Sequence, residues 1–227
     1  MKKIKLLAIC MIAVSTATSV KAQLATGADL VSSYVWRGIP QEGAGGTPNI
    51  QPYVSFTAGG LTIGSWASGS FSGNIKEVDL YATYAISSAF SVTLTDYNYN
   101  LISIPNYFDY TATGGHVFEG TVAYSGTAFS ASINSMFAGA DKLGNGKNAY
   151  STYIELGYQI NPLAKVFVGG LLNESATYGT TGIGLTNVGL KVSKSIIITD
   201  KFSLPIYGIL GANPTSGKAF FVAGITL

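Results

Sequence analysis

The chain has 227 residues, of which 11% are charged, with 13 Lys and Arg against 11 Asp and Glu. It is rich in glycine (28) and tyrosine (14), and its mean hydropathy is positive. The sequence has no basic cluster, which argues against a nucleic-acid partner. Few charges, positive hydropathy and no apolar run beyond the N-terminus long enough for a spanning helix disfavour a soluble secreted enzyme and favour a β-barrel in lipid.

The N-terminus predicts a secretory signal peptide. Three lysines within the first five residues precede a short apolar run, and "SVKAQ" offers a cleavage site after Ala22. We therefore expect residues 1–22 to be removed and residues 23–227 to form one domain. Cleavage removes four lysines, which leaves 9 basic against 11 acidic residues, a net charge of −2. It also removes Cys10, so the mature chain would have no disulfide and no thiolate chemistry.

Downstream of the signal, apolar and polar residues alternate with a period of two, which is typical of β-strands. In "VDLYATYAI", Val78, Leu80 and Tyr84 share one face, and Asp79 and Thr83 share the other. Most of the predicted strands are about nine to twelve residues long, close to the about 9–11 that cross a membrane. In chain order the twelve predicted strands are 28–37, 49–58, 61–70, 77–86, 90–98, 116–125, 129–138, 149–160, 164–173, 185–196, 202–212 and 219–227.

The predicted connections alternate between long and short along the whole chain. Outer-membrane barrels show this pattern, with short turns on the periplasmic side and long loops outside. An even number of strands places both termini on one side, and pairing the first strand with the last removes both sheet edges. The predicted fold is an all-β, single antiparallel up-and-down transmembrane β-barrel of about twelve strands, preceded by a cleaved signal peptide.

The apolar face of each strand is assigned outward, toward lipid. Tyrosine and tryptophan recur near the predicted strand ends, where aromatic girdles lie in membrane barrels. The predicted girdle residues are Tyr34, Trp36, Tyr124, Tyr150 and Tyr158.

Several short motifs support this reading. "DLVSSYVWRGIPQ" resembles the N-terminal signature of the TorF-like porin family, which are small Gram-negative outer-membrane barrels. "TIGSWASG", "TDYNYN" and "HVFEGTVAY" are similar to its later motifs, and "KAQ" and "NPTSGKAFFVAGITL" to versions from Bacteroidetes-like bacteria. The resemblance covers most of the mature chain and implies an outer-membrane barrel with a pore. The last residue, Leu227, departs from the aromatic residue that usually ends such barrels.

Mid-strand charges fall on the face opposite the apolar one. A lipid-facing Arg or Lys near the bilayer midplane would cost about 2–4 kcal/mol, so this face is predicted to line the lumen. The charges either line an eyelet that sets ion selectivity or form a structural network that fills the barrel. Arg37, the only arginine, is expected at the outer rim of the lumen, whereas strict alternation turns Asp96 outward and so predicts that it lies at the rim or beside a bulge. The lumen and selectivity candidates are Asp29, Arg37, Glu77, Asp79, Glu119, Glu155 and Lys191.

The longest predicted loop, 97–115, is rich in aromatic residues and asparagine. Three arrangements are open: it folds into the barrel as a constriction, it presents rings on which a ligand stacks, or it packs on its own aromatics at the surface. The candidate residues are Tyr97, Tyr99, Tyr107, Phe108 and Tyr110.

Enzyme chemistry finds little support. His116 is the only histidine, and Glu119 lies on the opposite face of the same predicted strand, so no hydrolase triad is apparent. Without a second histidine an ordinary zinc site is not expected. "DKLGNGKN" has Thr152 where a calcium loop needs a bidentate glutamate. We expect no catalytic residue, cofactor or metal.

The predicted function is passive diffusion of ions or small solutes through a narrow polar lumen. Eight strands leave a filled interior and sixteen a water channel, so twelve strands predict a narrow or partly occluded pore. The alternative is a non-conducting barrel that is structural or whose loops bind a ligand or partner. Either protein would lie in the outer membrane of a Gram-negative bacterium, in contact with lipid, lipopolysaccharide and small solutes or ions.

Overall fold

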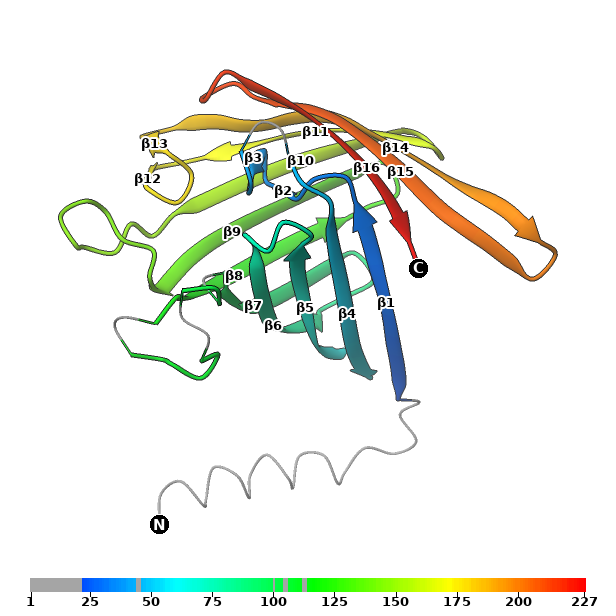
Figure 1. Ribbon diagram of the computed structural model, residues 1–227, viewed down its shortest axis with the longest axis horizontal. Helices are drawn as coiled ribbons and strands as arrows, with labels where there is room; N and C mark the ends of the chain where they lie inside the picture. The colour runs from blue at the N-terminus through cyan, green and yellow to red at the C-terminus, as the bar shows by residue number, and fades with distance from the viewer. Residues whose placement is uncertain (1–21, 44–45, 100, 104–105, 112–113) are drawn as a thin grey trace, which may run out of the picture.

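Twelve antiparallel strands close into one barrel (Figure 1). The computed structural model describes residues 22–43, 46–99, 101–103, 106–111 and 114–227, so the predicted signal peptide lies outside the described residues apart from Ala22. The wall consists of β1 (Gln23–Val31), β4 (Asn49–Ala58), β5 (Leu61–Ser70), β6 (Lys76–Ala85), β7 (Phe90–Asn98), β8 (His116–Ser125), β9 (Phe129–Gly139), β10 (Thr152–Asn161), β11 (Ala164–Leu171), β14 (Gly184–Thr199), β15 (Phe202–Asn213) and β16 (Lys218–Thr226).

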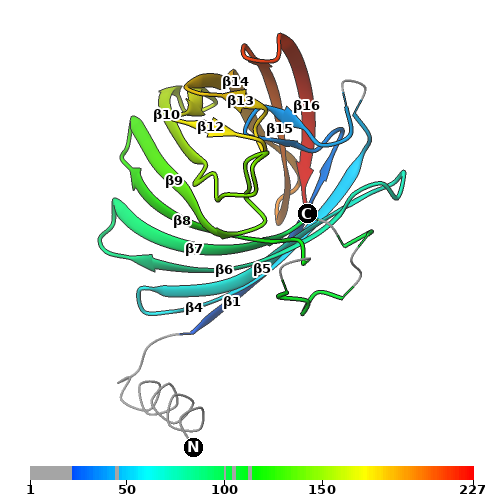
Figure 2. The same ribbon diagram turned by 90° about the vertical axis from the view of Figure 1, so that its left-hand side faces the viewer.

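The sheet closes because β1 pairs with both β4 and β16. Two small hairpins stand apart from this wall: β2 (Val35–Trp36) with β3 (Ile39–Pro40), and β12 (Glu174–Ser175) with β13 (Thr180–Thr181). Both belong to long connections at the same end of the barrel (Figure 2). No helix among the described residues is long and apolar enough to cross a membrane.

The predicted all-β, twelve-stranded closed barrel is confirmed, and most strands lie within a few residues of their predicted bounds. The first strand is the exception. It was expected over 28–37, but it begins at Gln23 and ends at Val31. The chain then bends at 32–33, and the alternation that continues through 34–36 belongs to the β2–β3 hairpin.

Long and short connections alternate as predicted. The connections 32–48, 71–75, 99–115, 140–151, 172–183 and 214–217 share one end of the barrel, which we call the loop end. The connections 59–60, 86–89, 126–128, 162–163 and 200–201 share the other, the turn end. Both small hairpins belong to the loop end.

The two faces of the wall differ in composition. Large apolar side chains stand exposed on the outer face of every region of the ring, including Val54 of β4, Leu94 of β7, Leu156 of β10 and Leu210 of β15. The inner face carries buried polar residues such as Asn49, Ser68 and Asn134. This is the reverse of a soluble barrel, whose apolar face is inside.

Part of the high glycine and tyrosine content has a geometric explanation. At five cross-strand pairs an inward aromatic ring lies over a glycine on the neighbouring strand, and a Cβ on that glycine would come within 2.1–2.6 Å of the ring or its hydroxyl. Each glycine lets its partner ring lie flat against the wall, so the rings take less of the lumen. The pairs are Gly27 with Tyr53, Gly64 with Tyr81, Gly189 with Phe167, Gly211 with Phe220 and Gly224 with Tyr207.

Candidate functional site

The predicted lumen charges all reach the interior of the barrel, but they do not gather in one place. Asp29 of β1 accepts a hydrogen bond from Tyr207, and the Lys191 ammonium lies 4.4 Å from the centroid of that ring. Glu155 of β10 accepts from Tyr153 at 2.6 Å and from Asn187 at 3.0 Å. Glu77 and Asp79 are buried on β6, and Arg37 and Glu119 pair near the loop end.

Arg37 enters the lumen on the β2–β3 hairpin rather than on the first wall strand. The hairpin turns at Arg37 and Gly38, whose φ angles are 48° and 81°, and the Gln41 N–H donates to the Tyr34 carbonyl oxygen at 2.9 Å. Two successive positive φ values define the tight type I′ turn. A Cβ at Gly38 would stand 1.9 Å from the Thr186 carbonyl oxygen, so glycine is required there by close approach as well as by conformation.

A positive φ is uncommon for a non-glycine residue and costs about 1–3 kcal/mol. The contacts of the Arg37 side chain hold the residue in this backbone conformation. The guanidinium donates to both carboxylate oxygens of Glu119, at 2.6 and 2.8 Å, and to the Tyr178 hydroxyl at 2.6 Å. It also lies 4.7 Å from the ring centroid of Trp36 and 4.8 Å from that of Tyr153. We call this group, Trp36, Arg37, Glu119, Tyr153 and Tyr178, the Arg37 clamp.

The Arg37 clamp is well buried, since the Glu119 side chain is 1% exposed and that of Arg37 is 14% exposed. A bidentate guanidinium–carboxylate pair is the strong form of this interaction, and burial makes loss of either partner costly. Burial raises the pKa of Tyr178 above its ordinary value, so the phenol stays neutral while it accepts the hydrogen bond from Arg37. Arg37 therefore anchors the hairpin to the far wall.

An apolar cluster packs around the clamp. Val117, Met136 and Leu171 from three wall strands surround Tyr153 and Tyr178. Trp36, Ile39 and Tyr97 pack against this cluster from the hairpin and β7. With these contacts the hairpin and the tip of the 172–183 connection form a plug inside the lumen at the loop end.

The prediction that Tyr34 and Trp36 belong to a lipid-facing girdle is wrong. Both point into the barrel: Tyr34 is buried and lies 5.5 Å from Trp66, and Trp36 lies 4.9 Å from Tyr178. They turn inward because the first strand ends before them. The other predicted girdle residues, Tyr124, Tyr150 and Tyr158, are exposed.

Tyr178 is a functional residue that the sequence did not single out. Its only local signal is a lone aromatic side chain among small residues in "ESATYGTTGIG". Nothing in that stretch predicts that the loop would lean inward to meet an arginine 141 residues away.

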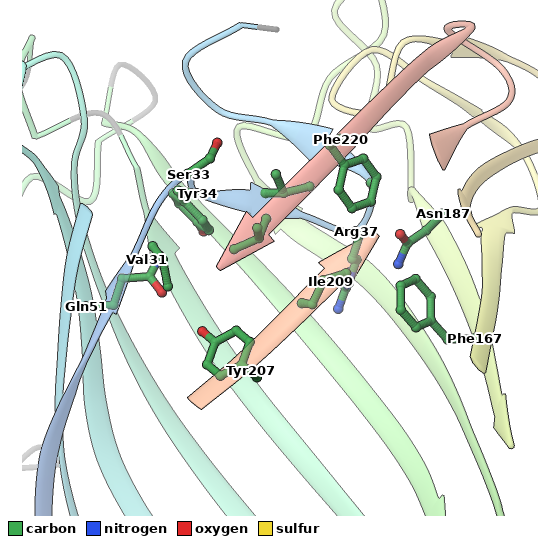
Figure 3. Close-up of a pocket in the computed structure, with 13 residues that line it drawn as sticks. Val31, Ser33, Tyr34, Arg37, Gln51, Phe167, Asn187, Tyr207, Ile209 and Phe220 are labelled. Atoms are coloured by element: carbon green, nitrogen blue, oxygen red, sulfur yellow. The ribbon is translucent and has the colours of Figure 1, made fainter. Parts of the chain in front are cut away.

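Two cavities flank the hairpin. One, of about 150 Å³, lies between the hairpin and the wall, with Tyr34 and Arg37 on one side and Asn187, Tyr207 and Phe220 on the other (Figure 3). The second, of about 190 Å³, lies toward β6, β7 and β9 and is lined by Tyr34, Trp36 and Tyr97 among others. The β2–β3 hairpin therefore separates the open space at this end of the lumen into two cavities.

The 97–115 candidates separate into two groups. Tyr97 faces the lumen and donates to Glu119 at 3.1 Å, and Tyr99 lines the larger cavity. Tyr107 and Tyr110 instead donate to Asp96 on the outer face of β7, at 3.3 and 3.0 Å. Residues 106–111 of this loop thus pack against the outside of the wall, with Phe108 76% exposed, and do not form the constriction (Figure 2).

His116 fastens the loop to the wall. Its Nδ1 lies 2.6 Å from the Asp96 carboxylate, its Nε2 lies 2.6 Å from the Tyr107 carbonyl oxygen, and Tyr110 stacks on the ring at 4.1 Å. The outward orientation predicted for Asp96 is confirmed. We call His116, Asp96, Tyr107 and Tyr110 the His116 latch.

Among the residues that the structure describes, no group of three or more His, Cys, Asp and Glu side chains is placed to hold a metal ion. No protein-family model matches the chain, and a comparison with curated proteins finds no significant match.

Proposed function

We propose that this protein is a porin-like channel of the Gram-negative outer membrane, narrowed by an internal plug. The observation that carries the proposal is the reversed barrel: apolar side chains outside, polar and charged side chains inside. Exposed apolar area on this scale is far beyond the few hundred Å² usual for a soluble monomer, and lipid would cover it. The resemblance to TorF-like porins agrees with this and stays a prediction.

The plug sets the size of the proposed pathway. Solutes would pass on either side of the hairpin, through the two cavities of about 150 and 190 Å³, and only ions or small solutes fit such passages. The charged and polar side chains beside them, including Arg37, Asn187 and Glu77, would bias which ions pass. We propose no catalytic activity; lipid, lipopolysaccharide and the permeant solutes are the proposed partners.

A non-conducting barrel is the second candidate, and the Arg37 clamp favours it. A guanidinium bound by two carboxylate oxygens, a phenol and two aromatic rings holds the hairpin firmly across the lumen. If the plug does not move, the barrel serves as a structural or ligand-binding protein.

Single-channel conductance in a planar bilayer separates the two candidates. The barrel is purified from membranes after expression of the full chain and compared with Arg37→Ala. We expect small discrete steps from the wild type, and larger steps with altered ion selectivity from Arg37→Ala, because the variant frees the hairpin. Lys201→Ala, which removes an exposed cation at the turn end, should conduct like the wild type. Folded protein that never conducts, with or without Arg37, would exclude the channel.

A further inference from the structure

Two buried carboxylates in the lumen have no ion-pair partner. Glu77 and Asp79 are each 5% exposed and lie two residues apart on the inner face of β6. The ion pairs within the described part of the chain are Arg37 with Glu119 and His116 with Asp96, and neither includes these residues. Lys76, next in sequence to Glu77, is exposed, and alternation turns it to the opposite face.

Hydrogen bonds satisfy these carboxylates only in part. The Tyr34 hydroxyl lies beside Glu77, and the Asn98 N–H donates to Asp79 at 3.2 Å. Burial raises the pKa of Tyr34 well above its ordinary value, so its hydroxyl stays neutral. Neither partner is a cation. Two like charges so close and so poorly solvated call for a neutralising positive charge or a proton.

The larger cavity adjoins one of these carboxylates. Glu77 lines it together with the rings of Tyr34, Trp36, Tyr97 and Tyr99, and the Met136 side chain closes one side. Tyr99 is 43% exposed, so the cavity lies next to the outside of the barrel at the loop end. Aromatic faces around a carboxylate are the surroundings that recognise a methylated ammonium group.

We propose that this cavity binds a small organic cation with a methylated ammonium head. The carboxylate of Glu77 balances the charge, and the Tyr97 and Tyr99 rings contact the methyl groups. A cavity of about 150 Å³ is known to hold benzene, so one of about 190 Å³ suits a ligand of about seven heavy atoms, the size of choline. Arg37 does not fill this role, because both terminal nitrogens of its guanidinium are engaged with Glu119 and Tyr178 in the Arg37 clamp.

The site requires the hairpin to stay in place in the lumen, but it does not depend on conduction, so it goes beyond the proposed channel. The hairpin supplies Tyr34 and Trp36, and the wall supplies Glu77, Tyr97 and Met136. A barrel that never conducts can still bind the cation, and a channel can conduct without binding it. Binding to the protein in detergent micelles therefore tests the site separately from the pore.

The full chain is expressed, and the barrel is purified from membranes into detergent micelles. Choline is then titrated into it in a calorimeter. Its uncharged isostere, 3,3-dimethylbutan-1-ol, is titrated in parallel. We expect one choline site, with the isostere binding at least tenfold more weakly because it lacks the charge. Equal binding of the two probes would overturn the proposal, as would absence of choline binding to folded barrel.

Matched variants locate the bound cation. Glu77→Gln should weaken choline binding at least tenfold and leave the isostere unchanged, and Tyr99→Ala should weaken choline binding at least threefold. Glu174→Gln neutralises an exposed loop-end carboxylate and should have no effect. Because Tyr99 is half-exposed, its truncation tests the site even where Glu77→Gln does not fold. Choline affinity unchanged in Tyr99→Ala and in folded Glu77→Gln would place the cation elsewhere and refute the site.

Discussion

Segments 32–48 and 99–115 both belong to the loop end of the barrel and both carry aromatic residues, but the β2–β3 hairpin of the first and residues 106–111 of the second dock on opposite sides of the wall. The first is drawn inside by Glu119, and the second is held outside by Asp96. These two carboxylates are almost neighbours: in the pairing of β7 with β8, Thr95 lies opposite Glu119 and Asp96 opposite Phe118. A single step along a strand reverses the direction of a side chain. Whether each segment docks inside or outside the barrel thus follows from the direction in which its carboxylate partner points from the wall.

Loss of Glu119 should give the largest effect on this arrangement. Glu119→Ala leaves Arg37 buried without its carboxylate, and removing one partner of a buried pair costs about 3–5 kcal/mol. We expect the hairpin to open more easily, seen as faster hydrogen exchange of the Gln41 amide, which donates to Tyr34 across the hairpin.

The double variant Glu119→Ala, Arg37→Ala should lose less hairpin stability than the two single variants added together. Each single change also leaves a buried charge without its partner, and the double change does not. Glu174→Ala, at an exposed position, serves as control. Unchanged exchange in Glu119→Ala would mean that the hairpin is held by its apolar contacts alone.

His116→Ala should release the outer segment and leave the inner one in place. The change removes the hydrogen bonds of the ring and its stack with Tyr110, and it leaves Asp96 with only its two tyrosine donors, a loss of about 1–3 kcal/mol. Chymotrypsin cleavage within residues 106–111 should become faster, while exchange at Gln41 stays as in the wild type.

Lys147→Ala, at an exposed position in another loop, is the matched control for this cleavage. If His116→Ala also accelerates exchange at Gln41, the two segments are coupled through the wall and the independence argued above is wrong.

Tyr178→Phe should have the smallest effect. It deletes one hydrogen bond to Arg37 and keeps the ring that stacks on Tyr153 and Trp36, so we expect a loss of about 1 kcal/mol in hairpin stability, again read at Gln41. Tyr84→Phe, on the outer face, should change nothing. A loss as large as that of Glu119→Ala would show that the phenol, rather than the carboxylate, anchors the guanidinium.

The inward positions of Asp29, Glu77, Asp79, Glu119, Glu155 and Lys191 follow from alternation once the membrane-barrel loop pattern sets the apolar face outward, as does the outward position of Asp96. The error at Tyr34 and Trp36 has the same origin. Alternation continued through residues 34–36, so nothing in the local pattern marked the point where the chain left the wall. The last backbone contact of this segment with the wall is at Ser32, whose N–H donates to the Ala223 carbonyl oxygen on the last strand.

The sequence by itself determined the number of strands, their faces and the side on which the long connections lie. These are local properties: side chains reverse direction at every residue, and turn residues mark each end. Only the tertiary structure decided which long segment plugs the barrel. Arg37 meets Glu119 and Tyr178 from positions 82 and 141 residues away in the chain. Such contacts exist only after closure of the ring brings β8 and the 172–183 connection around the same hairpin.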